Sequence, residues 1–289
     1  MKAFKKRIIH LHHCRGINSK GIIKIIQSDP TLKNLYKTPP SKLKSIINSS
    51  PEHFSKFYYD LHHLKIDQIL STYQKHHIYC LTVFDPDYPY LLKQCYNPPL
   101  ALYAIGNVSL LNSPCVAIVG SRKGNIYGRK AIEQILPTLI KKKITIISGL
   151  AKGIDTMAHE MTILHGGKTI CVLGSGFFHI YPQENRRLAE NMKKEHLLLS
   201  EYPPNTKPQR WHFPMRNRII SGLSKGIVVI QAEEKSGSLI TADFALQENR
   251  EVFAIPGSVV DPLSKGTNFL IQQGAKLVLT GDDILEEIY

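Results

Sequence analysis

Six short runs of hydrophobic residues recur along the second half of the chain, and nearly all of them close on glycine. They read CVAIVG, ITIISG, KTICVLG, GIVVIQA, EVFAIPG and KLVLTG. Unbroken runs rich in Val and Ile are typical of strands that are covered on both faces of a parallel sheet. Helical segments are predicted between most of the runs, at about residues 126–142, 153–165, 184–194, 239–249 and 266–273. This alternation predicts an α/β fold with a doubly wound, mostly parallel sheet.

The first part of the chain has a different pattern. Residues 1–80 show short helical periods separated by polar breaks and by proline or glycine, which predicts a small helical domain. Two proline-rich stretches follow, DPDYPYLL and NPPLALYAIGN, and the second of them favours an additional edge strand. HLLLSEY is a further strand candidate. We therefore expect an N-terminal helical domain at 1–80 and a larger domain at 81–289 that begins with the connector.

The charge balance indicates an anionic partner. The chain of 289 residues carries a formal net charge of +14, of which residues 1–110 contribute +9 and residues 111–289 contribute +5. The hydrophobic content of 43% excludes a mainly disordered chain. A basic surface that only aids solubility remains an alternative on charge alone.

The cysteines and histidines do not form metal-binding patterns. The five cysteines are odd in number and include no CxxC pair, and Cys115 and Cys171 stand inside apolar runs, which fits a reduced, cytoplasmic protein. Eight of the 13 histidines lie within residues 1–80, several of them as adjacent pairs that point in different directions on a helix. We expect no metal, no cofactor, no signal peptide and no membrane span.

The loops after the strands carry the candidate chemistry, because in such a sheet ligands bind beyond the carboxyl ends of the strands. After the first run, Gly120 allows close backbone approach, Ser121 offers a hydroxyl and Arg122 can bind a phosphate. A helix-capping serine beside a surface arginine is the alternative. After the second run, Gly149, Lys152 and Gly153 suit a phosphate nest, with Asp155 expected as a partner of the helix dipole.

Two further loops complete the predicted rim. The third contains Gly174, Phe177 and Asn185; Phe177 is a candidate for stacking on bases, with plugging of the sheet edge as the alternative, and Tyr181 is expected in the core. The fourth begins with an arginine-rich segment around Trp211 and ends on the turn Ser236-Gly237-Ser238, which precedes a helix. A helix N-terminus after small residues favours an anion, although an ordinary cap is an alternative.

Several enzyme classes lack their motifs. The first turn has no GxGxxG and no acidic residue ends the second strand, which argues against dinucleotide-dependent oxidation. The lysine loop lacks the Gly-Lys-Ser/Thr ending of a P-loop, and no GxSxG elbow is present. The loops offer glycine, hydroxyls and cations without a carboxylate pair or an activated nucleophile. They therefore predict a binding groove for a polyanion.

Several long motifs, in order, resemble those of the DNA-processing protein A (DprA, or Smf) family. They read DPDYPYLL, NPPLALYAIGN, VGSRKGNIYG, ISGLAKGIDTMAH, TICVLGSGFFHIYPQEN, SEYPP, WHFPMRNRIISGLS and SGSLITADFALQENREVFAIPG. The resemblance covers about residues 80–289, and residues 1–80 are only loosely similar to the family's sterile-alpha-motif-like domain. It implies a Rossmann-like fold. Members of that family often end in a winged-helix domain, whereas this chain stops at Tyr289 soon after the last predicted strand, so we expect no C-terminal winged helix here.

The resemblance also implies a function without catalysis. Members bind single-stranded DNA, load the RecA recombinase onto incoming strands in natural transformation, and work as homodimers. The family's basic pocket corresponds to Gly120, Ser121 and Arg122. Lys152 stands where many members carry arginine, so the positive charge is kept but the two parallel hydrogen bonds of a guanidinium to a phosphate are lost. The predicted DNA-binding residues are Gly120, Ser121, Arg122, Gly149, Lys152, Gly153, Gly174, Phe177, Asn185, Arg210, Arg216, Asn217, Arg218, Ser236, Gly237 and Ser238.

One enzyme on the same sheet remains the rival hypothesis. Phosphoribohydrolases of the Lonely Guy type resemble this fold and rely on a PGGxGTxxE loop. The corresponding stretch here, AEEKSGSLITADFA, lacks the glycine run and the glutamate at that spacing. The sequence therefore favours a sequence-nonspecific binder of single strands over a nucleotide-processing enzyme.

Overall fold

The computed structural model describes residues 2–289, which form two compact units. The first unit comprises Met1–Tyr88 and Pro99–Tyr103, and the second comprises Pro89–Pro98 and Ala104–Tyr289. The sequence places the division at residue 80, whereas in the structure the chain passes between the units more than once. The two units are therefore described separately.

The first unit is mainly helical. Its elements are α1 (Ala3–His13), α2 (Ser19–Ser28), η1 (Leu35–Lys37), α3 (Pro40–Ile47), α4 (Pro51–His63), α5 (Ile66–Lys75) and β1 (Tyr79–Thr82). The helices are short and are capped locally: Asn18 caps α2, and Ser50 caps α4 ahead of Pro51 at its first position. Their apolar sides form one core that includes Ile8, Leu11 and Phe57. The turn before α2 packs on α4, where Arg15 pairs with Asp60 at 2.7 Å.

Histidines of α1 form hydrogen bonds with buried tyrosines in this unit. His12 Nδ1 lies 3.1 Å from the hydroxyl of Tyr103, and His13 Nε2 lies 2.7 Å from that of Tyr73. Burial lowers the pKa of His12 to about 3 and that of His13 to about 4. Within residues 2–289, no group of three or more His, Cys, Asp or Glu side chains is placed to hold a metal ion. These two histidines therefore have a structural role as neutral hydrogen-bonding groups.

We expect the first unit to lose stability in acid. A histidine whose pKa is lower in the folded than in the unfolded state binds fewer protons when folded, so its contribution is present above pH ~6.5 and is lost as the pH falls toward 4. Hydrogen exchange of the α1 amides should be faster at pH 5 than at pH 7, after correction for intrinsic rates. His13→Gln should reduce this dependence, whereas His53→Gln, at an exposed position, should leave it unchanged. Equal protection at both pH values would contradict the assignment.

The second unit contains a parallel sheet. Its strands are β3 (Cys115–Val119), β4 (Thr145–Ser148), β5 (Thr169–Leu173), β6 (Leu197–Ser200), β7 (Gly226–Val229), β8 (Glu251–Ala254) and β9 (Lys276–Leu277), and β2 (Ala101–Gly106) runs into this unit from the first. From β6 the order is β6-β5-β4-β3-β7-β8-β9, with every pairing parallel. The order reverses between β3 and β7, so the predicted doubly wound, Rossmann-like sheet is confirmed.

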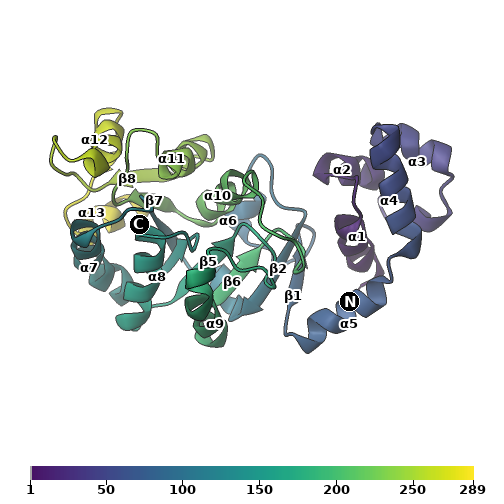
Figure 1. Ribbon diagram of the computed structural model, residues 1–289, viewed down its shortest axis with the longest axis horizontal. Helices are drawn as coiled ribbons and strands as arrows, with labels where there is room; N and C mark the ends of the chain where they lie inside the picture. The colour runs from purple at the N-terminus through teal and green to yellow at the C-terminus, as the bar shows by residue number, and fades with distance from the viewer. Residues whose placement is uncertain (1) are drawn as a thin grey trace. The chain divides into compact units, whose positions relative to one another are not determined.

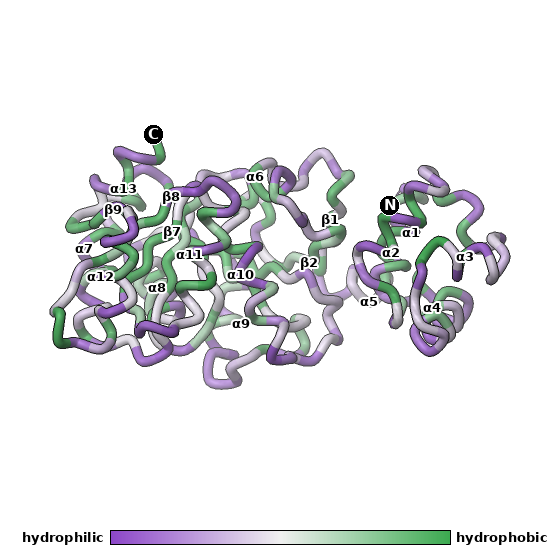
Figure 2. Tube along the Cα trace, turned by 90° about the horizontal axis from the view of Figure 1, so that it is seen from above, coloured by the Kyte–Doolittle hydropathy of each residue, from purple (hydrophilic) through white to green (hydrophobic). Residues whose placement is uncertain are grey.

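Helices cover both faces of this sheet (Figure 1). They are α6 (Tyr90–Lys93), α7 (Ile126–Lys141), α8 (Ile154–Leu164), α9 (Arg186–Glu195), α10 (His212–Leu223), α11 (Gly237–Gln247), α12 (Lys265–Gln272) and α13 (Gly281–Ile288), with 3-10 turns η2 (Val108–Asn112), η3 (Gln183–Asn185) and η4 (Pro262–Ser264). The helices α7, α8 and α13 pack on one face through a large apolar cluster, and α10 and α11 pair on the other. Figure 2 shows hydrophobic colouring along β7 and β8.

Several elements of the structure are absent from the sequence-based assignment. The helix α10 falls in a stretch interpreted as an aromatic and arginine cluster, where Pro214 at its third residue and the dispersed arginines hide the helical period. Proline is tolerated in the first turn of a helix, because the N–H groups there lack partners within the helix. The strand β1, the short helix α6 and the helix α13 were not predicted either, whereas HLLLSEY forms β6 as predicted.

The cysteines are unpaired thiols. All five cysteines are free, and burial raises the pKa of Cys95 to about 11 and that of Cys115 to about 12. These thiols are consequently protonated at neutral pH and behave as small hydrophobic groups. No helix within residues 2–289 has the length and apolar character required to cross a membrane.

Candidate functional site

A pocket of about 620 Å³ opens where the strand order of the second unit reverses. The loops that follow β3 and β7 and the N-terminal parts of α10 and α11 form most of its wall, and residues that follow β4 and β5 complete it. Its lining residues are Val119, Gly120, Ser121, Arg122, Lys123, Ala151, Asp155, Tyr181, Arg210, Phe213, Pro214, Arg216, Asn217, Ile220, Glu233, Lys235, Ser236, Gly237, Ser238, Ile240 and Thr241. The pocket therefore brings together residues of all four predicted loops, of which the first and the fourth, more than 80 residues apart in the sequence, contribute most.

The loop after β3 is held rigidly against the end of β7. The backbone N–H of Ser121 donates to the carbonyl of Gln231 at 2.7 Å, and the Ser121 hydroxyl accepts from the N–H of Lys123 at 3.1 Å. The Gln231 side chain exchanges two hydrogen bonds with Asn125, each of 3.1 Å. Asn125 in turn caps α7. Ser121 thus organises the turn that presents Arg122, and Gln231 is a supporting residue that the sequence analysis missed.

Three cations at the pocket have no partner within the described part of the chain. Arg122, Arg210 and Lys235 are exposed, and none of them makes an ion pair or a hydrogen bond within residues 2–289. By contrast, the Lys123 ammonium pairs with Glu233 at 2.9 Å. Unpaired arginine and lysine side chains around a concave surface attract a polyanion and can contact several of its charges. Lys235 was missed in the sequence, although it directly precedes the turn singled out there.

The turn Ser236-Gly237-Ser238 begins α11 and faces the same pocket. Ser236 is the N-cap, and its hydroxyl accepts from the N–H of Ser238 at 3.4 Å. The Ser236 and Ser238 hydroxyls are 2.8 Å apart, and an added Cβ at Gly237 would meet no atom within 4 Å. The cap and an open approach to the helix N-terminus therefore coexist. Binding of a phosphate by this turn stays a prediction.

Aromatic rings line the opposite side, and they are not those predicted. Phe177 is only 3% exposed, so its ring has no free face, and the expectation that it stacks on bases is wrong. Tyr181, expected in the core, is 50% exposed and contacts Phe213 with ring centroids 5.4 Å apart. Both rings line the main pocket and an adjoining slot of about 80 Å³. The backbone path of the loop after β5 determines which of the two rings is exposed, and the type of residue alone does not predict this path.

The lysine loop after β4 is not a vacant phosphate nest. The carboxylate of Asp155, in the first turn of α8, accepts from the N–H groups of Gly149 at 3.1 Å and Ala151 at 3.3 Å. Gly153 adopts a φ of +73°, and a Cβ there would lie 2.7 Å from the backbone carbon of Arg122. Gly153 therefore permits close contact between the two loops. Asp155 is the helix-terminus partner that was expected, and it occupies the donors assigned to phosphate.

Arg216 is almost completely buried, and it forms part of the pocket floor. Its guanidinium donates to the carbonyls of Gly149 and Val172 and lies against Gly149, where a Cβ would collide with it. Burial lowers the pKa of Arg216 and raises that of Asp155, and their mutual attraction opposes both shifts. Arg216 joins the ends of β4 and β5, so its primary role is to position the loops. It does not lie free on the surface as the prediction assumed, and its binding of DNA stays a prediction.

Arg218 and Asn185 are likewise used by the protein itself. Arg218 Nη2 donates to both carboxylate oxygens of Glu201, at 2.5 and 2.6 Å, and Nη1 donates to the carbonyl of Asn97 at 2.7 Å. Both side chains of this ion pair are only 11% exposed. Asn185 is buried and donates to the carbonyl of Leu150 at 2.9 Å. Neither residue is available to DNA in this structure.

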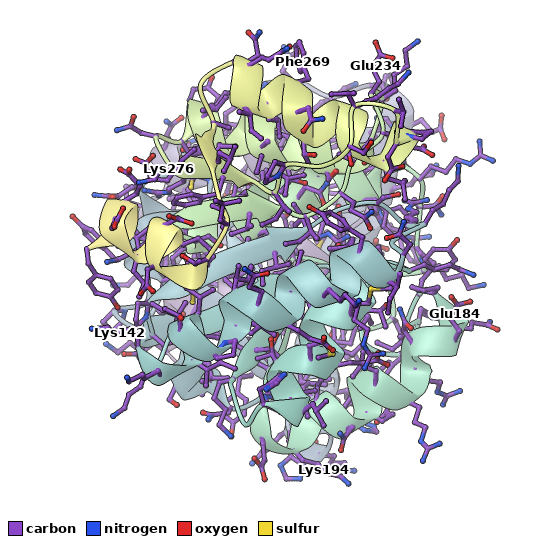
Figure 3. The ribbon with its side chains drawn as sticks, turned by 90° about the vertical axis from the view of Figure 1, so that its left-hand side faces the viewer. Lys142, Glu184, Lys194, Glu234, Phe269 and Lys276 are labelled. Atoms are coloured by element: carbon purple, nitrogen blue, oxygen red, sulfur yellow. The ribbon has the colours of Figure 1, made fainter. Side chains whose placement is uncertain are left out.

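The remaining predicted residues occupy intermediate positions. Asn217 lines the pocket, and its side-chain oxygen accepts from Arg216 Nε at 3.1 Å. Lys152 borders the small slot but pairs with Glu184 at 2.6 Å, and Glu184 lies at the surface near the start of α9 (Figure 3). Gly174 is buried, and a Cβ there would lie 2.8 Å from the Phe213 ring. Gly174 and Gly149 therefore allow side chains to pack closely.

The family is decided by sequence comparison. A family model described as DNA recombination-mediator protein A matches residues 79–289. The DNA processing protein DprA of Bacillus subtilis (strain 168) is 49% identical over 225 residues, which are 78% of this chain and 76% of that protein. The chain belongs to the DNA-processing protein A family. The family's protein from Streptococcus pneumoniae (strain ATCC BAA-255 / R6) is 48% identical over 206 residues, 71% of this chain and 73% of that one.

Solved structures of the family agree with the fold. The X-ray structure of DNA processing protein A from Streptococcus pneumoniae matches with a TM-score of 0.87 and 39% identity over 99% of both chains. The corresponding protein from Helicobacter pylori, whose structure is reported for its single-stranded DNA binding mode, matches with a TM-score of 0.65 and 29% identity over 72% of this chain and 94% of that chain. The recognition of the family from its motifs is thus confirmed.

Proposed function

We propose that the pocket binds single-stranded DNA without regard to sequence. The observation that carries this proposal is the set of three unpaired cations, Arg122, Arg210 and Lys235, around one pocket at the switch point of the sheet. Cations contact the sugar–phosphate backbone, which is common to all sequences, while exposed rings accept any base. The single-stranded DNA binding of the Helicobacter pylori relative supports the same assignment.

In the cell, we propose, the bound strand is incoming DNA in natural transformation, and the protein loads RecA recombinase onto it. The family description as a recombination mediator supports this role. We further propose that the working form is a cytoplasmic homodimer and that the site performs no catalysis. The buried His159 donates to or accepts from Thr169 at 2.7 Å, so it faces the fold rather than the pocket.

A titration that compares single strands with duplex of the same length tests the binding proposal. We expect tighter binding of the single strand, little dependence on base sequence, and a steep loss of affinity with rising salt. Mass measurement of the complex gives the number of chains on each strand. Preference for duplex, or binding that is insensitive to salt, would refute the proposal. Release of free base from nucleoside monophosphates would instead favour the phosphoribohydrolase.

Tyr181 supplies a more specific prediction. Because its ring is half exposed beside Phe213, Tyr181→Ala should weaken binding of single strands by about 1–3 kcal/mol, the usual contribution of one base stacked on an aromatic ring. Fluorescence anisotropy with a labelled strand measures the change. Tyr96→Ala removes a tyrosine that is 98% exposed and does not line the pocket, and it should bind normally. Equal affinities of the two variants would remove Tyr181 from the site.

A further inference from the structure

A second basic surface lies on the N-terminal unit. Between residues 20 and 44 the chain carries six lysines and one acidic residue, Asp29. We name these lysines the lysine segment; they are Lys20, Lys24, Lys33, Lys37, Lys42 and Lys44. They stand on α2, on α3 and on the loop between these helices, and all of them are exposed.

The lysine segment lacks the local charge compensation found elsewhere in the same unit. Lys5 pairs with Asp85 at 2.8 Å, Lys6 with Asp67 at 2.5 Å and Lys56 with Glu52 at 2.6 Å. None of the six lysines forms an ion pair or a side-chain hydrogen bond within residues 2–289. The carboxylate of Asp29 accepts from the N–H of Asn34 at 2.8 Å and from Thr31, so it caps its own loop.

Like charges remain close together in this segment. Lys20 and Lys24 are four residues apart on α2 and therefore share one helix face, a spacing at which equal charges repel. The opposite, apolar sides of α2 and α3 pack on the unit's core, with Ile22, Leu43 and Ile47 buried there. The lysines consequently project from the two helices away from the core, and an external anion would relieve their repulsion.

An aromatic ring lies within the same surface. Tyr36, in η1 between Lys33 and Lys37, is 38% exposed, and its hydroxyl is held by His10 Nδ1 at 2.9 Å. A ring anchored at its polar end with an outward face, flanked by unpaired cations, is the combination used to bind single-stranded nucleic acid. The same lysines could attract an anionic lipid surface, but membrane-binding surfaces usually combine cations with several exposed apolar side chains that enter the lipid.

From these observations we propose that the lysine segment with Tyr36 is a second contact for a single-stranded DNA chain whose other part occupies the pocket of the second unit. This inference rests on the proposed function. Because the two units belong to one chain, a strand bound in the pocket meets the segment at a raised effective concentration, so weak backbone contacts add to the overall affinity. The requirement is a strand long enough to reach both surfaces.

The test uses the full chain with strands of about 10 and about 40 nucleotides, the shorter being within the range that a single binding surface covers. Lys20→Ala/Lys24→Ala/Lys42→Ala should weaken binding of the long strand roughly tenfold. The slope of log affinity against log salt concentration should become shallower by up to about 2, because each lost phosphate contact removes about 0.7 from it. Binding of the short strand should be unchanged. The matched control, Lys2→Ala/Lys65→Ala/Lys75→Ala, removes three exposed, unpaired lysines of the same unit.

The outcomes separate this inference from the proposed function. If the segment variant and the control bind the long strand equally, the second contact is refuted while the pocket stands. If the wild-type chain binds neither strand, both proposals fail. Phosphatidylglycerol vesicles provide the remaining arm: loss of vesicle binding by the segment variant, with unchanged binding of both strands, would assign the surface to a membrane and overturn the inference.

Discussion

Replacing both Arg122 and Arg210 by alanine should lower the affinity for single-stranded DNA roughly tenfold at about 150 mM salt. Each arginine is exposed at the pocket and has no partner within residues 2–289, so each is free to displace counterions from a phosphate. For single strands each phosphate contact contributes about 0.7 to the slope of log affinity against log salt concentration. The slope for the double variant should therefore be shallower by about 1.4. Titrations at several salt concentrations measure both quantities.

A matched pair of substitutions on α7 controls for net charge. Arg129 and Lys130 are exposed but do not line the pocket, and Arg129 is already paired with Glu133 at 3.2 Å. Arg129→Ala/Lys130→Ala changes the total charge equally and should retain nearly full affinity. An identical loss in the two double variants would mean that overall charge, rather than the pocket, attracts the strand.

The second large effect concerns stability. Arg218→Met should lower the free energy of unfolding of the second unit by about 3 kcal/mol, because it leaves the buried carboxylate of Glu201 without its cation. Burial already raises the pKa of Glu201, and the neighbouring guanidinium opposes that rise. Urea unfolding followed by the fluorescence of Trp211, the single tryptophan, measures the loss. Replacing both partners in Arg218→Met/Glu201→Met should recover much of it, since no unpaired charge remains.

Two comparisons make this result specific. Arg129→Met breaks an exposed ion pair, whose side chains are 50% and 40% accessible, and should cost no more than about 1 kcal/mol. Under conditions where Arg218→Met remains folded, its affinity for single strands should equal that of the wild type. A specific loss of affinity with unchanged stability would restore Arg218 to the DNA-binding surface.

The fold was accessible to sequence reasoning because its signals are local and repeated. Unbroken Val and Ile runs such as Cys115–Val119 and Thr169–Leu173 need only their own residues to indicate buried parallel strands. The glycine after most of these runs marks the edge at which the loops meet. By contrast, α10 was missed because its apolar face is formed by a few residues among arginines. Its packing on α11 stabilises the helix, and this contact cannot be recognised from the local sequence pattern.

Some features of the candidate site were likewise predictable from the sequence, and others required the tertiary structure. The sequence by itself determined the sheet, the edge that carries the ligand loops, and the family, because these depend on spacing and residue type. Only the tertiary structure decided which cations are free: Arg122 and Arg210 reach the pocket, whereas Arg216 and Arg218 are held by carbonyls and by Glu201. A guanidinium binds a backbone carbonyl, a carboxylate or a phosphate with the same donors, so its role is set by the groups that the fold brings beside it.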